Sequence, residues 1–375
     1  MKRWHLVPEV LFVAGEASGD LHAAGVAEVL GRIRPDLALT GFGGPLLEKA
    51  GVKLFDRYET GLMGFVEIIR HIPRHWSLLE RIRERIAGGD VRLLLAVDYP
   101  GFNMKAAAAA ADAGIPVLYY VTPQVWAWGE GRIPKLARIV SKAAVILPFE
   151  ENLLRGHGID ATFVGHPLLD RAGELPPRAE ARAALGLSDD APVLALFPGS
   201  RDQEIDRHLD DFVASAREVQ KARPQVQVVV SVAPTVKIDI DRCPFTMVHE
   251  ASFSVLRAAD AALCKSGTAT LEAAIADCPL AIAYRTSEIS YLLARLMVTI
   301  KHIGLVNVVA GREIAMEFVQ HDLEPRRVAK QLLRLLDATD AERRRVLEGL
   351  AEVRGKLGTP GAARRVAEMA SGLVP

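Results

Sequence analysis

Short runs of β-branched and other apolar residues alternate with amphipathic helical patterns from the beginning of the chain. The first run, 10–14, ends in a glycine-containing turn and is followed by a helical pattern over 21–34. Further runs typical of buried strands cover 38–42, 93–97, 117–121, 144–147 and 162–164. Strands that alternate with helices in this way predict β-α-β units and one parallel sheet.

The pattern breaks down between residues 170 and 192, where Arg, Glu, Pro and Ala dominate. The pair Pro176 and Pro177 is compatible neither with a helix interior nor with a central strand, so we expect the domain linker here. A second series of apolar runs follows, at 193–197, 226–232, 245–248, 261–264 and 280–283. The fold class is therefore α/β, with two doubly wound parallel sheets in domains 1–172 and 190–344.

Composition and charge narrow the class of protein. The 375 residues carry 46 Lys and Arg against 46 Asp and Glu, and this zero net charge does not favour binding to nucleic acid. Three cysteines form no CxxC pair, so we expect a reducing compartment, with no disulfide and no structural zinc. The N-terminus does not resemble a signal peptide, and no apolar stretch approaches the ~18 residues of a membrane span. These features predict a cytoplasmic protein.

Two glycine-containing turns in the second half have the form of phosphate sites. Gly199, Ser200 and Arg201 follow the run 193–197 and open a long helical pattern. Unpaired backbone N–H groups and the helix dipole favour an anion there, and the guanidinium can donate to two phosphate oxygens. The alternative is an ordinary strand-to-helix turn with a capping serine.

The second turn, 266–272, reads SGTATLE and also lies between a predicted strand and a predicted helix. Gly267 would let a diphosphate approach the backbone, and the hydroxyls of Ser266 and Thr268 could donate to it. Glu272, about one helical turn further on, could accept both hydroxyls of a ribose. Alternatively, the hydroxyls cap the helix and Glu272 is a surface charge.

Polar residues also follow the predicted strands of the first half. Glu16, Ser18 and Asp20 lie after the first strand, where they could bind sugar hydroxyls or cap the helix that follows. Asp98 follows the apolar run 93–97, with Asn103 shortly after it. A carboxylate at the carboxyl end of a central strand can remove a proton from a hydroxyl, although Asp98 could also cap a helix.

Aromatic and apolar side chains mark two further segments. Gln124, Trp126 and Trp128 follow the strand 117–121, where the rings suit stacking on a sugar or lipid, or packing in the core. The stretch 61–86 combines apolar residues with five arginines, which favours a membrane interface, an amphiphilic ligand, or two amphipathic helices packed on the sheet. Its apolar candidates for membrane or acyl-chain contact are Leu62, Met63, Phe65, Val66, Ile69 and Trp76.

Taken together, these motifs resemble the lipid A disaccharide synthase family, inverting glycosyltransferases of the two-Rossmann (GT-B) type. The resemblance covers nearly the whole chain. It rests on AGEASGD (14–20), GFGGP (41–45), MGFVEI (63–68), DYPGFN (98–103), VTPQVWAW (121–128), LPFE (147–150), VGHPLLD (164–170), PGSR (198–201), SGTATLE (266–272) and AGRE (310–313). SGTATLE is shared by several sugar-nucleotide families, whereas the tryptophan segment together with AGRE is more specific.

The resemblance implies transfer of 2,3-diacylglucosamine from its UDP derivative to 2,3-diacylglucosamine 1-phosphate, with a β-1,6 link formed and UDP released. It assigns the general base to Asp98, a phosphate contact to Arg201 and the ribose contact to Glu272, and it places Asn307 and Arg312 in the donor-site segment. No cofactor and no metal are expected.

The resemblance also concerns location and assembly. It implies peripheral contact with an anionic membrane on its cytoplasmic face, and a monomer or homodimer. By analogy with GT-B folds, we expect the C-terminal helices, about 345–375, to pack back on the first domain.

Two other functions are compatible with parts of this pattern. A nucleotide-sugar epimerase of the same two-domain form would keep SGTATLE but would need no acceptor pocket. A nucleotide-sugar sensor or membrane-docking module without catalysis would not need Asp98.

Overall fold

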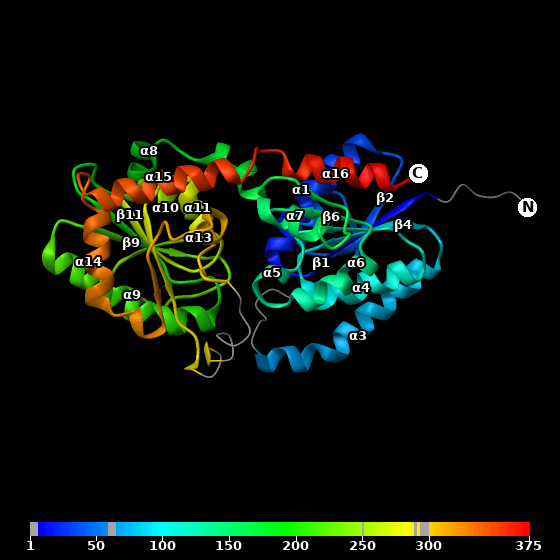
Figure 1. The fold of residues 1–375 in the computed structure, drawn as a ribbon, viewed down its shortest axis with the longest axis horizontal. Helices are drawn as coiled ribbons and strands as arrows, with labels where there is room; N and C mark the ends of the chain where they lie inside the picture. The colour runs from blue at the N-terminus through cyan, green and yellow to red at the C-terminus, as the bar shows by residue number, and fades with distance from the viewer. Residues whose placement is uncertain (1–6, 59–64, 250, 289–290, 293–299) are drawn as a thin grey trace, which may run out of the picture. The chain divides into compact units, whose positions relative to one another are not determined.

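The computed structural model describes residues 7–58, 65–249, 251–288, 291–292 and 300–375 (Figure 1). The chain forms two compact units, Met1–Asp170 with Gly358–Pro375, and Arg171–Leu357. The transition back to the first unit lies after residue 357 rather than near residue 345. The helix Ala341–Lys356 (α15) therefore belongs to the second unit.

A seven-stranded parallel sheet forms the first unit, in the order β3-β2-β1-β4-β5-β6-β7. All six predicted strands are present, and β3 is an additional strand at the edge. The strands are β1 (Glu9–Ala14), β2 (Ala38–Gly43), β3 (Lys53–Arg57), β4 (Val91–Val97), β5 (Val117–Tyr120), β6 (Lys142–Val145) and β7 (Ala161–Phe163).

Helices cover both faces of this sheet because each central strand is apolar on both sides. On β1, Leu11 and Val13 belong to one buried cluster, whereas Val10 and Phe12 belong to the other. The first cluster includes residues of α3, α4 and α6, and the second includes residues of α1 and α16. The helices are α1 (Ala17–Ile33), α2 (Pro45–Lys49), α3 (Phe65–Ala87), α4 (Pro100–Asp112), α5 (Val125–Trp128), α6 (Ile133–Ile139), α7 (Pro148–Arg155) and α16 (Ala362–Leu373).

Helix α3 is one continuous helix over Phe65–Ala87, where one interpretation of the sequence was two amphipathic helices packed on the sheet. Its second half packs on the sheet through Leu78, Leu79, Ile82 and Ile86, all of which are buried.

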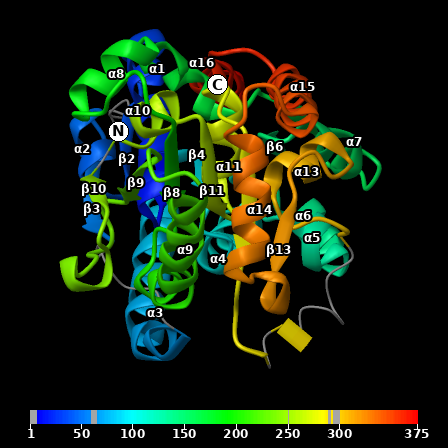
Figure 2. The same ribbon diagram turned by 90° about the vertical axis from the view of Figure 1, so that its left-hand side faces the viewer.

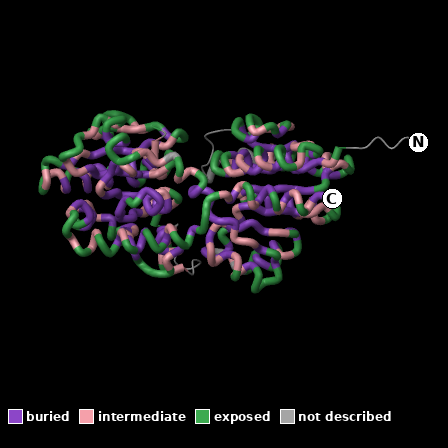
Figure 3. Tube along the Cα trace, turned by 90° about the horizontal axis from the view of Figure 1, so that it is seen from above, coloured by how far each residue is buried: buried purple, intermediate pink, exposed green. Residues whose placement is uncertain are grey.

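The second unit contains a six-stranded parallel sheet in the order β10-β9-β8-β11-β12-β13. Its strands are β8 (Val193–Phe197), β9 (Gln227–Val232), β10 (Thr246–His249), β11 (Ala261–Lys265), β12 (Leu280–Tyr284) and β13 (Glu317–Val319). The edge strand β13 is additional to the five that the sequence predicted. Figure 3 shows that the buried residues gather in the interior of each unit.

Helices α9 (Asp202–Ala222) and α14 (Pro325–Leu335) lie side by side on one face of the second sheet (Figure 2). The other face carries α10 (Ser252–Ala258), α11 (Thr268–Ile275) and α15. Helix α8 (Arg178–Ala184) forms inside the segment predicted to be a linker, and its buried Arg182 donates to Asp260 Oδ2 at 2.7 Å. That ion pair and the packing of α8 on α10 make most of the expected linker part of the second unit.

Because all strands of each sheet are parallel, their carboxyl ends share one edge, and ligands of open α/β sheets bind at such edges. No described helix is long and apolar enough to cross a bilayer.

Candidate active site

Asp98 follows β4 directly, in a turn that holds its backbone rigidly. Asp98 and Tyr99 both have left-handed backbone conformations, with φ of 50° and 48°. The Asp98 N–H donates to Tyr120 O at 2.9 Å, and its carbonyl oxygen accepts from the Tyr119 hydroxyl at 2.9 Å and from Asn103 Nδ2 at 2.8 Å. Three hydrogen bonds therefore fix the point from which the Asp98 carboxyl extends.

Asn103 is fully buried beneath this turn. Besides Asp98, its amide nitrogen reaches the carbonyl oxygens of Val13 at 3.2 Å and Val97 at 3.1 Å, at the ends of β1 and β4. Asn103 therefore ties the two strands together below Asp98. This position does not support the predicted contact of Asn103 with an acceptor.

The N-terminal turn of α1 lies against the Asp98 side chain. The exposed Ser18 donates from Oγ to Asp98 Oδ2 at 3.4 Å. Gly19 packs close as well, since a Cβ added there would lie 3.7 Å from Asp98 Cβ. The structure thus brings together Ser18 and Asp98, which the sequence had placed at the ends of two different strands.

An aromatic side chain that the sequence did not single out lies beside this carboxyl. The ring of Tyr99 covers Gly15, where an added Cβ would overlap with Tyr99 Cδ1. The Tyr99 hydroxyl lies 2.5 Å from Nε2 of His75, which comes from α3. Burial and the carboxylate of Glu16 raise the pKa of Tyr99, and Arg74 opposes them. Glu16 and Arg74 therefore lie close enough to this ring to influence its ionisation.

Asp20 has a structural role instead of the predicted contact with a sugar. Its side chain is 1% exposed and accepts hydrogen bonds from the N–H groups of Gly44 (2.7 Å), Leu46 (3.0 Å) and Leu47 (3.1 Å). These donors form the N-terminus of α2, whose unpaired N–H groups attract a carboxylate. The sequence had suggested a cap, but on the following helix α1.

The tryptophan segment is divided between core and surface. Trp126 is buried, donates from Nε1 to Glu150 Oε1 at 2.9 Å, and meets the Phe149 ring edge-on at 5.2 Å. It therefore packs in the core, as the alternative interpretation of the sequence had it, and does not stack on a sugar. Gln124 is exposed, and the side chain of Trp128 lies outside the described residues.

In the second unit, the first glycine turn closes on an acidic side chain of α9. Gly199 has a φ of 144°, and a Cβ added there would lie 2.5 Å from Glu204 Cβ, so this position requires glycine. The Ser200 N–H donates to Glu204 Oε2 at 2.9 Å. The half-exposed guanidinium of Arg201 lies 3.8 Å from Glu204 Oε1.

The second glycine turn contains one exposed hydroxyl and two that bond within the protein. Ser266 Oγ donates to Ile303 O at 2.7 Å, and Thr270 Oγ1 donates to Gly267 O at 2.8 Å. Thr268 is exposed at the first position of α11. Of the two hydroxyls predicted to bind a diphosphate, that of Thr268 is therefore the exposed one.

Lys265 and Glu204 form an ion pair between these two turns. Lys265 Nζ donates to Glu204 Oε1 at 2.7 Å. Burial raises the pKa of the Glu204 carboxyl, but Lys265, the Ser200 N–H and Arg201 outweigh burial, so the pKa lies below its ordinary value. Neither residue was among those predicted from the sequence to bind the donor. The sequence does contain one sign of such a site, because Lys265 directly follows a predicted strand and comes immediately before the turn that begins with Ser266 and Gly267.

Glu272 is partly buried on α11. Burial raises the pKa of its carboxyl, whereas Arg171 and the hydroxyl of Ser252 oppose this effect. Glu272 is therefore not an isolated charge on the surface, which was the alternative interpretation of its place in the sequence.

Asn307 and Arg312 bond mainly to parts of the second unit other than the glycine turns. The Asn307 side chain is buried and bonds to Ala315 O, to Glu317 Oε1 and to the N–H groups of Ile314 and Ala315, at 2.7 to 3.0 Å. An amide with two donors and two accepted bonds has no remaining capacity for a ligand. Arg312, beyond the C-terminal end of α13 (Leu305–Ala310), pairs with Glu352 on α15 at 2.6 Å.

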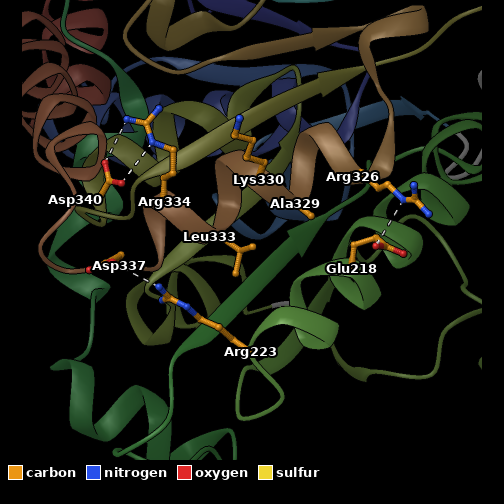
Figure 4. A pocket seen from close by; sticks show the side chains of 9 residues that line it. All are labelled: Glu218, Arg223, Arg326, Ala329, Lys330, Leu333, Arg334, Asp337 and Asp340. Carbon is orange, nitrogen blue, oxygen red and sulfur yellow. Dashed lines mark hydrogen bonds and ion pairs between the residues drawn. The ribbon is translucent and has the colours of Figure 1, made fainter.

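A surface cavity of about 450 Å³ lies at the C-terminal end of α9 and is shown in Figure 4. Three ion pairs line it: Arg223 with Asp337, Arg326 with Glu218, and Arg334 with Asp340. Because α9 begins at the Gly199 turn and this cavity lies at its C-terminal end, the cavity is separate from the candidate site.

Comparison with known proteins supports the resemblance seen in the sequence. Residues 10–357 match the family described as lipid-A-disaccharide synthetase. The lipid-A-disaccharide synthase of Myxococcus xanthus is 42% identical over 380 residues, which cover 98% of each chain. The lipid-A-disaccharide synthase of Syntrophus aciditrophicus is 39% identical over 374 residues, which cover 97% of each chain.

Solved structures of low sequence identity show the fold. A UDP-GlcNAc 2-epimerase from Neisseria meningitidis, bound to UDP-GlcNAc, has a TM-score of 0.65 at 14% identity and covers 97% of this chain and 100% of its own. The calicheamicin glycosyltransferase has a TM-score of 0.63 at 16% identity and covers 98% of each chain. Epimerases and glycosyltransferases thus share this GT-B fold, so the fold alone does not distinguish them. The sequence match does distinguish them: the chain belongs to the lipid-A-disaccharide synthase family.

Proposed function

We propose that this lipid-A-disaccharide synthase transfers 2,3-diacylglucosamine from its UDP derivative to the 6-hydroxyl of 2,3-diacylglucosamine 1-phosphate. The products are the β-1,6-linked disaccharide 1-phosphate and UDP. The observation that carries the proposal is the rigid turn that presents Asp98, with Ser18 against it, at the carboxyl end of β4. Membership of the family supports the choice of substrates.

The second unit binds the UDP part of the donor in this proposal. The guanidinium of Arg201 and the exposed hydroxyl of Thr268 hold the diphosphate, and Glu272 accepts the ribose hydroxyls. The positive ends of α9 and α11 add a favourable field, since both helices begin at these turns. The Ser266 hydroxyl does not bind the diphosphate in this proposal, because it donates to Ile303 O and so holds the second glycine turn in place.

Asp98 is the general base of the proposed reaction. It removes the proton from the acceptor hydroxyl as that oxygen attacks the anomeric carbon from the face opposite UDP. The bond from the anomeric carbon to the β-phosphate oxygen breaks, its electron pair stays on the phosphate, and the diphosphate site stabilises this charge. One displacement of this kind inverts the anomeric centre.

The test compares native enzyme with Asp98→Asn, using release of UDP with and without the acylated acceptor. We expect release from native enzyme only when acceptor is present, and a fall in kcat of about 10²- to 10⁴-fold in the variant. Asp160→Asn, at an exposed ion pair of the same unit, serves as the control with full activity. Full turnover by Asp98→Asn, or an isomerised sugar formed without acceptor, would overturn the proposal.

We also propose that the N-terminal part of α3 and the segment before it contact an anionic membrane. Trp76 on α3 is 56% exposed, and both proposed substrates carry acyl chains. Leu62 and Met63 lie outside the described residues, as do the side chains of Phe65, Val66 and Ile69, although the last three belong to the backbone of α3. Exposed aromatic rings flanked by arginines bind readily at the lipid headgroup level.

Vesicle sedimentation tests this contact. Trp76→Ser, and a variant with Leu62, Phe65 and Ile69 changed to Ser, should pellet less with phosphatidylglycerol vesicles than native protein. Ile240→Ser removes a 74% exposed apolar side chain from the second unit and should pellet like native protein. Equal pelleting of all four proteins would mean that another surface meets the membrane.

A further inference from the structure

The ion pair between Lys265 and Glu204 joins two segments that the sequence presents as independent anion sites. Lys265 is the last residue of β11, and Glu204 lies in the first turn of α9. Their side chains are 17% and 13% exposed, so the pair is largely withdrawn from solvent. Charges in such a position interact more strongly and are screened less by salt than exposed charges.

Both members of the pair touch a glycine of the proposed diphosphate site. A Cβ added at Gly199 would lie 2.8 Å from Glu204 Oε2, and one added at Gly267 would lie 3.9 Å from Lys265 Nζ. Glu204 also accepts from the Ser200 N–H at 2.9 Å through the oxygen that does not hold Lys265. A single carboxylate thus connects the backbone of the first turn with a cation at the second.

We propose that Lys265 binds the donor diphosphate and that Glu204 is a positioning residue that holds the Lys265 ammonium beside Gly267. This inference rests on the proposed function, whose donor site it deepens. An ammonium has three N–H donors, and Glu204 takes one of them in the described part of the chain, which leaves donors for phosphate oxygens. The Tyr284 ring, 5.8 Å from Nζ, provides a second contact that limits where the ammonium can lie.

Lys265 also contributes to the departure of UDP in this arrangement. Negative charge grows on the β-phosphate as its bond to the anomeric carbon breaks, and an ammonium that is already in place stabilises that charge. Glu204 remains a carboxylate, because Lys265, Ser200 and Arg201 together outweigh its burial. The geometry of the Gly199 turn and the position of the cation are therefore coupled through one side chain.

A purely structural ion pair would affect stability without distinguishing ligands with and without phosphate. Titration calorimetry of the full-length protein with UDP and with uridine separates the two roles. Lys265→Met keeps the length and apolar stem of the side chain and removes its charge. We expect this variant to bind UDP about 10- to 100-fold more weakly, in line with the loss of a charge-assisted hydrogen bond, and to bind uridine as native protein does.

Three further variants complete the experiment. Lys265→Arg should retain most of the UDP affinity, and Lys221→Met, which changes an exposed lysine of α9, should bind like native protein. In native protein the Ser200 N–H and Lys265 Nζ bond to different oxygens of Glu204, and in Glu204→Gln one of these two oxygens is replaced by an NH2 group, which cannot accept from either donor. We expect this variant to lose UDP affinity in the same sense as Lys265→Met, but by a smaller factor, with uridine binding unchanged.

The outcomes separate this inference from the function on which it rests. If native protein binds UDP more tightly than uridine and Lys265→Met keeps that difference in full, Lys265 does not bind the diphosphate and the inference is wrong. An equal loss of UDP and uridine binding would show a structural role and would also overturn it. If native protein shows no preference for UDP over uridine, the proposed donor site itself fails.

Discussion

Glu150 is a carboxyl held inside the first unit by two N–H donors. Its oxygens accept from Trp126 Nε1 at 2.9 Å and from the Leu147 N–H at 3.0 Å. Burial raises its pKa to about 7, and these hydrogen bonds offset only part of that increase. A carboxyl whose pKa is higher in the folded protein than in the unfolded chain makes the folded protein less stable as pH rises.

We therefore expect Glu150 to reduce the free energy of unfolding by roughly 3 kcal/mol between pH 4.5 and pH 8. Its stabilising contribution is complete below its unfolded pKa and is lost as pH rises through about 7. Urea unfolding of native protein and Glu150→Gln measures this effect, because the difference between their free energies of unfolding should change across that pH range.

The control is Glu342→Gln. Arg345 lowers the pKa of Glu342 to about 2, so the Glu342→Gln difference should be flat above pH 5. A flat difference for Glu150→Gln as well would contradict the expectation.

Individual residues also show how far sequence reasoning reaches at this scale. Asp98 and Arg201 lie beyond the carboxyl ends of β4 and β8, as predicted. The end of a buried strand can be located from the local pattern of apolar residues, so the residues that follow it can be placed as well. Asp20 and Asn307 have equally suitable positions and chemistry, yet their bonds go to N–H and carbonyl groups of the chain itself. Those partners come from segments distant in sequence or from a turn whose shape the sequence does not reveal.

At the scale of elements, the C-terminal helix α16 completes the core of the first unit although it follows the entire second unit in sequence. Ala362, Val366 and Ala367 are buried with residues of α1 and β1. The approach is close at Gly25 of α1, where an added Cβ would lie 3.3 Å from the Cβ of Ala363. The stability of the first sheet should therefore depend on residues after 357.

Val366→Ala tests this dependence. We expect a loss of roughly 1–3 kcal/mol, because two buried methyl groups are removed from a packed core. Hydrogen exchange should accelerate in peptides of β1 and α1 and stay unchanged in peptides of β8 and α9. Arg364→Ala changes a 76% exposed side chain on the same helix and should change neither set of peptides. Faster exchange confined to the second unit would contradict the assignment of α16.

The two strands that sequence reasoning missed show the limit of pattern at this scale. β3 reads KLFDR, begins and ends with charged residues, and pairs with β2 alone among the described strands. β13 is three residues long and, within the part of the chain that the structure describes, pairs with β12 alone. Both lie at sheet edges, where a strand has one neighbour and needs no continuous apolar run, so these two sequences resemble loops, although the edge strands β7 and β10 were predicted. The central strands were predictable because both of their faces are buried.

At the scale of the whole molecule, the two units have separate cores and separate tasks in the proposed reaction. A ligand that binds only the folded form of a unit stabilises it by about 2.7 kcal/mol at a hundred times its Kd. UDP should therefore slow hydrogen exchange in peptides from residues 171–357 by up to about 100-fold where exchange requires unfolding of that unit. Peptides from residues 7–170 and 358–375 should exchange as they do without UDP.

Arg201→Ala separates protection by binding from a general effect of added nucleotide. This variant lacks the guanidinium that we assign to the diphosphate, so the same UDP concentration should protect its second unit less. We expect protection of the second unit alone because UDP binds only to that unit in the proposed mechanism. Asp98 and Ser18 belong to the first unit and bind no part of UDP. Equal protection of both units by UDP would mean that the nucleotide also engages the first unit, and the assignment of donor binding to the second unit alone would be wrong.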